Sequence, residues 1–78
     1  MSVYMEKIEP ETNCYRFYEI RIEPDLFAER SLVVSWGRIG QRGRMAVRGS
    51  GDRLSVECLA ATICKTRLKR GYNAIPPC

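Results

Sequence analysis

The residues best suited to ligand chemistry lie in one short segment, 35–44, which reads Ser-Trp-Gly-Arg-Ile-Gly-Gln-Arg-Gly-Arg. It contains the only tryptophan of the chain, Trp36, with three arginines, three glycines and no acidic residue. An aromatic ring beside guanidinium groups suits stacking on bases and contact with phosphates. The segment is therefore predicted either to bind a nucleic acid or to be a basic turn without a ligand.

Charge is distributed unevenly along the chain. Residues 1–28 contain six acidic and three basic residues, whereas residues 29–78 contain three acidic and ten basic residues. The net charge of +4 therefore divides into −3 and +7. A basic portion of this kind is typical of proteins that bind polyanions, and a solvated basic surface has the same composition.

Neither a catalytic site nor a metal site is predicted. The chain has no histidine, so a serine or cysteine nucleophile would lack its usual base. The glycines at 37, 40 and 43 lack the strand–glycine–helix context of a dinucleotide site. The chain is thus expected to be no enzyme and to need no cofactor.

The four cysteines form no C-x-x-C pair, and we expect free thiols in a cytoplasmic protein rather than a metal or disulfide framework. They are Cys14, Cys58, Cys64 and Cys78. No segment has the pattern of a signal peptide or the length of a membrane span, so membrane association is not expected.

A small antiparallel sheet with one helix is predicted to position these residues. Apolar and polar residues alternate over 15–23 and 31–38, with a return strand at 44–48 and a short edge strand at 3–8. The apolar period becomes helical over 53–70. The predicted fold is α+β: three to four antiparallel strands with a C-terminal helix packed across one face, in a single domain of residues 1–78.

The helix is expected to bury a stripe, begin at a cap and end at a glycine. Ser50 or Asp52 is the predicted cap, and Gly71 the C-terminal stop. The stripe comprises Val56, Leu59, Ala60 and Ile63. Leu26 and Phe27, in the loop after the alternating strand, are predicted to tuck under the edge of the sheet.

The predicted hairpin around residues 40–43 would bring arginines from both its arms together, since paired strands lie about 5 Å apart. The residues expected to share this patch are Arg38, Arg42, Arg44 and Arg48. Two places remain open for Trp36, because a single tryptophan on a strand suits either the core or contact with a ligand.

The string Trp36-Gly37-Arg38, followed by Ile39-Gly40 and Gly43, resembles the signature of the WGR domain family. Further blocks resemble its short bacterial members in order and spacing, over roughly residues 13–72. They are Asn13-x-x-Arg16-Phe17-Tyr18, Ile22-Glu23-Pro24-x-Leu26-Phe27, Leu32-Val33 and Lys69-Arg70-Gly71-Tyr72. The resemblance implies a small antiparallel sheet with one helix.

The resemblance also implies a partner. In poly(ADP-ribose) polymerases the domain contacts DNA near a strand break and docks on neighbouring domains. By motif position those contact roles fall to Trp36 and Arg38, and less directly to Asn13. The chain departs from the family near Ser50, where an aromatic is common, and near Val56, where alanine is common. The sequence shows neither catalytic nor zinc-finger domain, so the break-sensing role does not carry over.

The sequence thus predicts a small nucleic-acid-binding module without strong sequence preference, with DNA favoured over RNA. Trp36 would stack at an exposed end or single-stranded segment, and the patch of four arginines would hold phosphates. The alternative is a protein-interaction adaptor whose protein partner docks on the same tryptophan and arginine surface.

Overall fold

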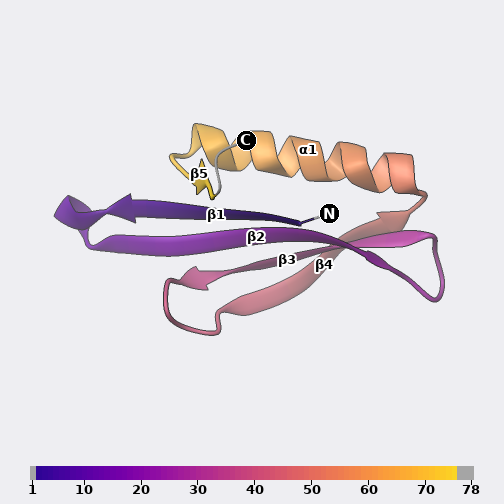
Figure 1. Ribbon diagram of the computed structural model, residues 1–78, viewed down its shortest axis with the longest axis horizontal. Coiled ribbons are helices and arrows are strands. Elements are labelled where there is room, and N and C mark those ends of the chain that lie inside the picture. Colours follow the sequence, from indigo (N-terminus) through magenta and orange to yellow (C-terminus); the bar gives the residue numbers. More distant parts are fainter. Residues whose placement is uncertain (1, 76–78) are drawn as a thin grey trace.

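The computed structural model describes residues 2–75 as one antiparallel sheet with a helix across one face (Figure 1). The sheet order is β4-β3-β2-β1-β5. In chain order the elements are β1 (Ser2–Glu9), the 3₁₀ helix η1 (Pro10–Thr12), β2 (Cys14–Pro24), β3 (Arg30–Arg38), β4 (Arg44–Gly51), α1 (Arg53–Lys69) and β5 (Asn73–Ala74). The α+β class is confirmed, with one strand more than expected.

The additional strand follows from the way α1 ends. The backbone N–H of Tyr72 donates to the carbonyl of Arg67 at 3.1 Å, and that of Gly71 to the carbonyl of Leu68 at 3.2 Å. This is a Schellman motif, and Gly71 supplies its left-handed residue with a φ of +96°. The prediction that the helix stops at Gly71 is therefore confirmed. The turn leads the chain back onto β1, where Ala74 pairs with Met5.

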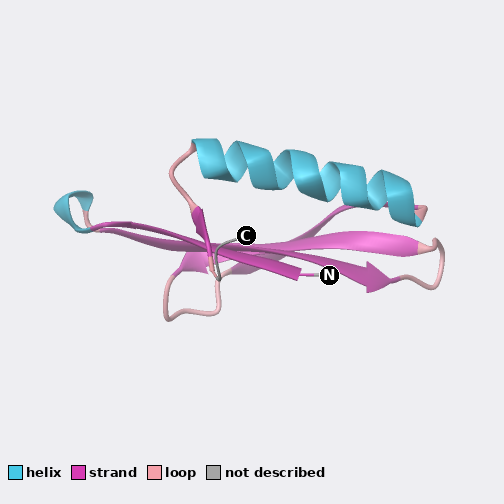
Figure 2. Ribbon diagram, turned by 45° about the horizontal axis from the view of Figure 1, so that its top comes forward, coloured by secondary structure: helices cyan, strands magenta, loops and turns pink. Residues whose placement is uncertain are grey.

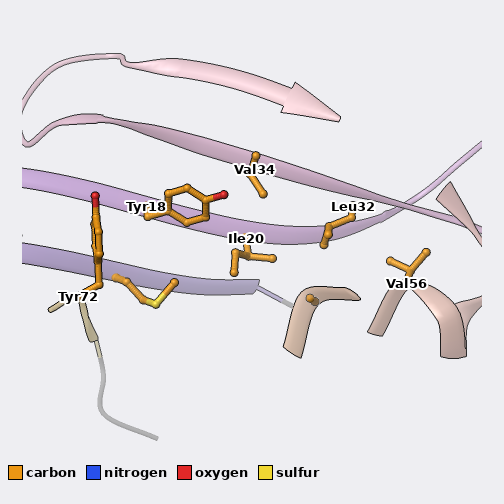
Figure 3. Close-up of a cluster of buried hydrophobic side chains, with 8 residues drawn as sticks. Tyr18, Ile20, Leu32, Val34, Val56 and Tyr72 are labelled. Carbon is orange, nitrogen blue, oxygen red and sulfur yellow. The ribbon is translucent and has the colours of Figure 1, made fainter. Parts of the chain in front are cut away.

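The core lies between α1 and the sheet face that it covers (Figure 3). The side chains with the least exposure are Met5, Ile20, Leu32, Val34 and Val56. The predicted alternation of β2 and β3 is confirmed, because Ile20, Leu32 and Val34 share this covered face. On the helix stripe Val56 and Ala60 are buried, whereas Leu59 and Ile63 pack at the margin.

The helix begins at one of the two predicted caps. Asp52 is the N-cap, and its Oδ1 accepts a hydrogen bond from the backbone N–H of Ser55 at 3.1 Å. Hydrogen bonding from the side chain of Ser55, and then from its backbone N–H, favours the charged carboxylate and lowers the pKa of Asp52. Ser50 instead belongs to β4, which runs three residues beyond the predicted end at Arg48. Pairing with β3 extends β4, a tertiary effect that the local glycine-rich sequence hides.

The expectation that Leu26 and Phe27 tuck under the sheet edge is wrong. Each is 96% exposed. The β2–β3 connection is closed locally, since the backbone N–H of Phe27 donates to Oδ1 of Asp25 at 2.9 Å. Such an Asx turn satisfies the loop backbone without requiring its apolar side chains to be buried.

Replacing Leu26 and Phe27 together with serine is therefore expected to change the free energy of unfolding by less than about 0.5 kcal/mol. Leu32→Ala, at a fully buried position, provides the contrast and is expected to cost about 2–5 kcal/mol. Urea unfolding followed by circular dichroism measures both. A loss above about 1.5 kcal/mol in the double variant would show that the loop packs in solution.

The described residues bear on the predictions for thiols, metal sites and membrane spans. Cys14, Cys58 and Cys64 are free thiols, and Cys78 lies outside the described residues, as do Pro76 and Pro77. Within residues 2–75 no cluster of three or more potential metal ligands occurs. No helix in that same span is both long and apolar enough to cross a membrane.

Candidate nucleic-acid interface

A hollow of about 630 Å³ lies on the helix side of the sheet, around the C-terminal end of α1. The β1–β2 hairpin extends past that end of the helix, so part of the sheet there is uncovered (Figure 2). The lining comes from the start of β2 and the residues before it, the end of β3, the bulge in β4, and the end of α1. These residues are Thr12, Asn13, Cys14, Tyr15, Arg16, Tyr18, Trp36, Gly37, Arg38, Arg48, Arg67 and Tyr72.

The structure brings together some of the predicted site residues and separates others. Asn13, Trp36, Arg38 and Arg48 all line the hollow, whereas Arg42 and Arg44 do not. The β3–β4 loop, which carries position 42, bends to the face away from α1 (Figure 2). Position 44 pairs with position 36 at the outer strand of the sheet. Of the four arginines predicted to share a patch, Arg38 and Arg48 line the hollow.

Arg48 lies on the helix side of β4 by strand alternation, because Ala46, two residues earlier, pairs with Val34 and packs against the core. In the ladder Leu32 lies opposite Gly49 and Val33 opposite Val47, which leaves Arg48 as the extra residue. The bulge instead brings Gly49 to the helix side as well, opposite Leu32, where an added Cβ would lie 2.8 Å from Leu59.

Trp36 takes both of the places left open for it. Its side chain is half-buried and packs against the core, yet it also forms part of the hollow's wall. It lies opposite Tyr18 in the β2–β3 ladder, so the two aromatic residues share the helix face. Packing holds the indole in place while leaving part of it accessible, which is the arrangement that a rigid stacking surface needs.

Asn13 joins the hollow through an unusual backbone conformation. It follows η1 with φ 53° and ψ 41°, and its backbone N–H donates to the carbonyl of Pro10 at 3.1 Å. Asparagine tolerates this left-handed region better than most residues. The residue is therefore explained by the turn as well as by any ligand contact.

Two further arginines, Arg16 and Arg67, line the hollow and were missed as site residues. The sequence carried a signal for each. Alternation places Arg16 on the same strand face as Tyr18. Arg67 follows Ile63 by four residues, so it continues the helix stripe as a charged residue where an apolar one is expected.

The guanidinium of Arg67 is held by aromatic rings. Its Cζ lies 4.3 Å from the ring centroid of Tyr18 and 5.9 Å from that of Tyr72. The two tyrosines meet edge to face with centroids 6.2 Å apart, and the turn at Gly71 delivers Tyr72 to this position. Cation–π contacts of this kind orient the guanidinium without neutralising it. Its Nε is buried and has no hydrogen-bond partner.

Positive charge is unopposed in this hollow. Among the described residues its lining includes four arginines and no carboxylate: Arg16, Arg38, Arg48 and Arg67. The nearby acids of β2 lie on the other face, where Glu19 and Glu23 pair with Arg21 at 3.7 and 3.4 Å. On that face Tyr4 donates to Glu6 at 2.9 Å, and burial followed by this bond raises the pKa of Tyr4. Glu9 of β1, which pairs with Cys14 and therefore shares the helix side, lies 3.9 Å from Lys7 and does not line the hollow.

The structure thus combines an antiparallel sheet covered by one helix with a hollow whose lining includes four arginines and Trp36. The chain belongs to the WGR domain family, whose model matches residues 1–77. It is similar to the uncharacterized protein y4dW of Sinorhizobium fredii (strain NBRC 101917 / NGR234), with 36% identity over 74 residues. That match covers 95% of this chain and 36% of the relative, so the chain spans about a third of the curated relative's length. No solved structure matches the chain significantly.

Proposed function

We propose that the protein binds nucleic acid, with DNA favoured, through the hollow around Trp36 and Arg38. The observation that carries the proposal is the convergence of four arginines on a hollow that no carboxylate lines within the described residues. Uncompensated guanidinium groups attract phosphate and release counterions when they bind it. Membership of the WGR family supports the same conclusion, since the domain contacts DNA in the polymerases that the sequence resembles.

The arginines and the tryptophan are proposed to contact different parts of the nucleic acid. Arg38 is exposed, with its Cζ 5.6 Å from the ring centroid of Tyr15, and it would contact phosphates together with Arg16. These two arginines are cross-strand neighbours in the β2–β3 ladder. Trp36 would present its accessible surface to a base or sugar. Neither contact reads base edges, so weak sequence preference is expected.

The proposal includes no catalytic role and no cofactor. It also places the protein in the cytoplasm, because three free thiols suit a reducing compartment. A protein partner on this surface is the competing outcome. It would be recognised as a stoichiometric protein that remains bound after nuclease treatment.

Tryptophan fluorescence tests the proposal directly, because the single tryptophan lines the hollow. Single-stranded, nicked and blunt duplex DNA are titrated into the protein at 50 mM salt, and the emission of Trp36 is followed. Binding is expected to change the emission. Arg38→Gln is expected to weaken affinity about tenfold, because it removes one charge-assisted contact.

Arg53→Gln is the matched control. Arg53 lies in the first turn of α1, and its Nε is 3.1 Å from Oε1 of Glu57. The control removes the same charge at the opposite end of the helix and is expected to leave affinity within about twofold, since a distant exposed charge is largely screened. Absence of binding by any of the three DNAs would refute the proposal. Equal loss in both variants would show net charge, rather than this hollow, to be responsible.

A further inference from the structure

A second hollow, of about 330 Å³, adjoins the first along α1. Three residues line both hollows: Tyr18, Arg48 and Arg67. The remaining lining comes from one side of the helix: Leu59, Thr62, Ile63 and Thr66. The shared residues make the two hollows neighbouring parts of one surface.

The second hollow differs from the first in chemistry. Leu59 and Ile63 are partly buried and pack against the core, so they form an apolar lining. The hydroxyls of Thr62 and Thr66 each donate to the backbone carbonyl four residues earlier at 3.1 Å. Their hydroxyl donors are therefore already used and are not available to a phosphate. This lining suits a flat, largely apolar group better than it suits a phosphate.

We propose that the second hollow receives an unpaired nucleobase of the strand whose phosphates lie in the first. The inference rests on the proposed function. Arg48 and Arg67 line both hollows, so a phosphate that contacts either of these two arginines places the attached nucleotide beside the second. Apolar side chains and arginines provide the stacking surfaces that bind bases without a sequence requirement.

This arrangement selects single strands over duplexes. A base within a duplex would have to leave its stack to enter the hollow, which costs a few kcal/mol. An unpaired base enters without that cost. The protein is accordingly expected to bind a single strand at least about tenfold more tightly than a blunt duplex of the same length.

Methyl NMR of the whole chain tests where the base lies. The probes are hexadeoxyadenylate and a hexamer of the same phosphodiester backbone made of abasic residues. Ring currents of a bound adenine are expected to shift the methyl resonances of Leu59 and Ile63. The abasic strand is expected to bind about tenfold more weakly and to leave those two residues unshifted.

A filled hollow gives a second readout. Thr62→Leu adds bulk at an exposed helix position that lines the hollow, and Ala61→Leu adds bulk at the next exposed position, which does not line it. We expect Thr62→Leu to abolish the preference for hexadeoxyadenylate over the abasic strand. The Ala61→Leu control is expected to retain it.

The outcomes separate this inference from the proposed function. If the strands bind in an Arg38-dependent manner but leave Leu59 and Ile63 unshifted, the base does not occupy the hollow and the inference is overturned. Equal shifts with the abasic strand would overturn it too, since no base is then involved. If neither strand nor duplex binds, the proposed function itself fails.

Discussion

Raising the salt concentration from 50 to 200 mM is expected to weaken binding of a single strand about 50-fold. The estimate follows from the four arginines of the hollow. Each phosphate neutralised on a single strand contributes about −0.7 to the slope of log affinity against log salt, which totals about −2.8. Because the guanidinium groups have no carboxylate partner in the hollow, none of this charge is already compensated within the described residues.

Each arginine removed from the hollow should reduce the magnitude of this salt slope by a similar amount. Arg38→Gln is expected to reduce its magnitude by about 0.7, and the double replacement of Arg16 and Arg38 by about 1.4. Arg53→Gln should leave it unchanged within error, since Arg53 lies away from the hollow and is paired with Glu57. Titrations at four salt concentrations measure the slopes. A slope that Arg38→Gln does not alter would show that Arg38 contacts no phosphate.

Gly43→Ala is expected to destabilise the fold by about 3 kcal/mol, a large fraction of the stability of a domain this small. Gly43 has a φ of +74°, a region that disfavours a Cβ. The added methyl would also collide with the backbone carbonyl of Trp36 and lie 2.8 Å from Cζ of Phe17. Strain and overpacking each cost about 1–3 kcal/mol, so their combination exceeds either alone.

Gly40→Ala provides the matched control for this effect. Gly40 lies in the same loop with a φ of +90°, but a Cβ there would meet no atom within 4 Å. It should therefore show the conformational cost alone, about 1 kcal/mol. Urea unfolding of both variants measures the difference. Equal losses would mean that the close approach to Trp36 and Phe17 relaxes without cost.

The same comparison links stability to the site. A methyl at Gly43 requires the loop, the carbonyl of Trp36 or the ring of Phe17 to shift, which changes the contact between the loop and Trp36. Folded Gly43→Ala protein is thus expected to bind DNA more weakly than folded Gly40→Ala protein. Gly43 therefore allows the close approach of the loop to the backbone of Trp36, in addition to permitting the turn.

Most of the architecture could be predicted because it depends on local chemistry. Alternation identifies β2 and β3, with Ile20, Leu32 and Val34 on the buried face. Asp52 and Gly71 mark the ends of α1 through interactions within a few residues of each. The prediction that Leu26 and Phe27 are buried is wrong, because apolar character alone does not show that another part of the protein covers a residue. Their 96% exposure follows from where the β2–β3 turn lies.

The sequence identifies the residue types of the site, which are Trp36 and its neighbouring arginines, and it indicates the family. The sequence does not predict which of these residues lie together in the fold, because that depends on contacts between distant segments. The β3–β4 pairing brings Arg48 to the helix side, the loop bends Arg42 away from it, and the β2–β3 pairing places Arg16 beside Arg38. The Schellman turn brings Tyr72 against Tyr18, and both rings hold Arg67. The local sequence pattern predicts which face of a strand or helix is buried and where the helix ends. The pairing and packing of separate elements decide which arginines lie close together.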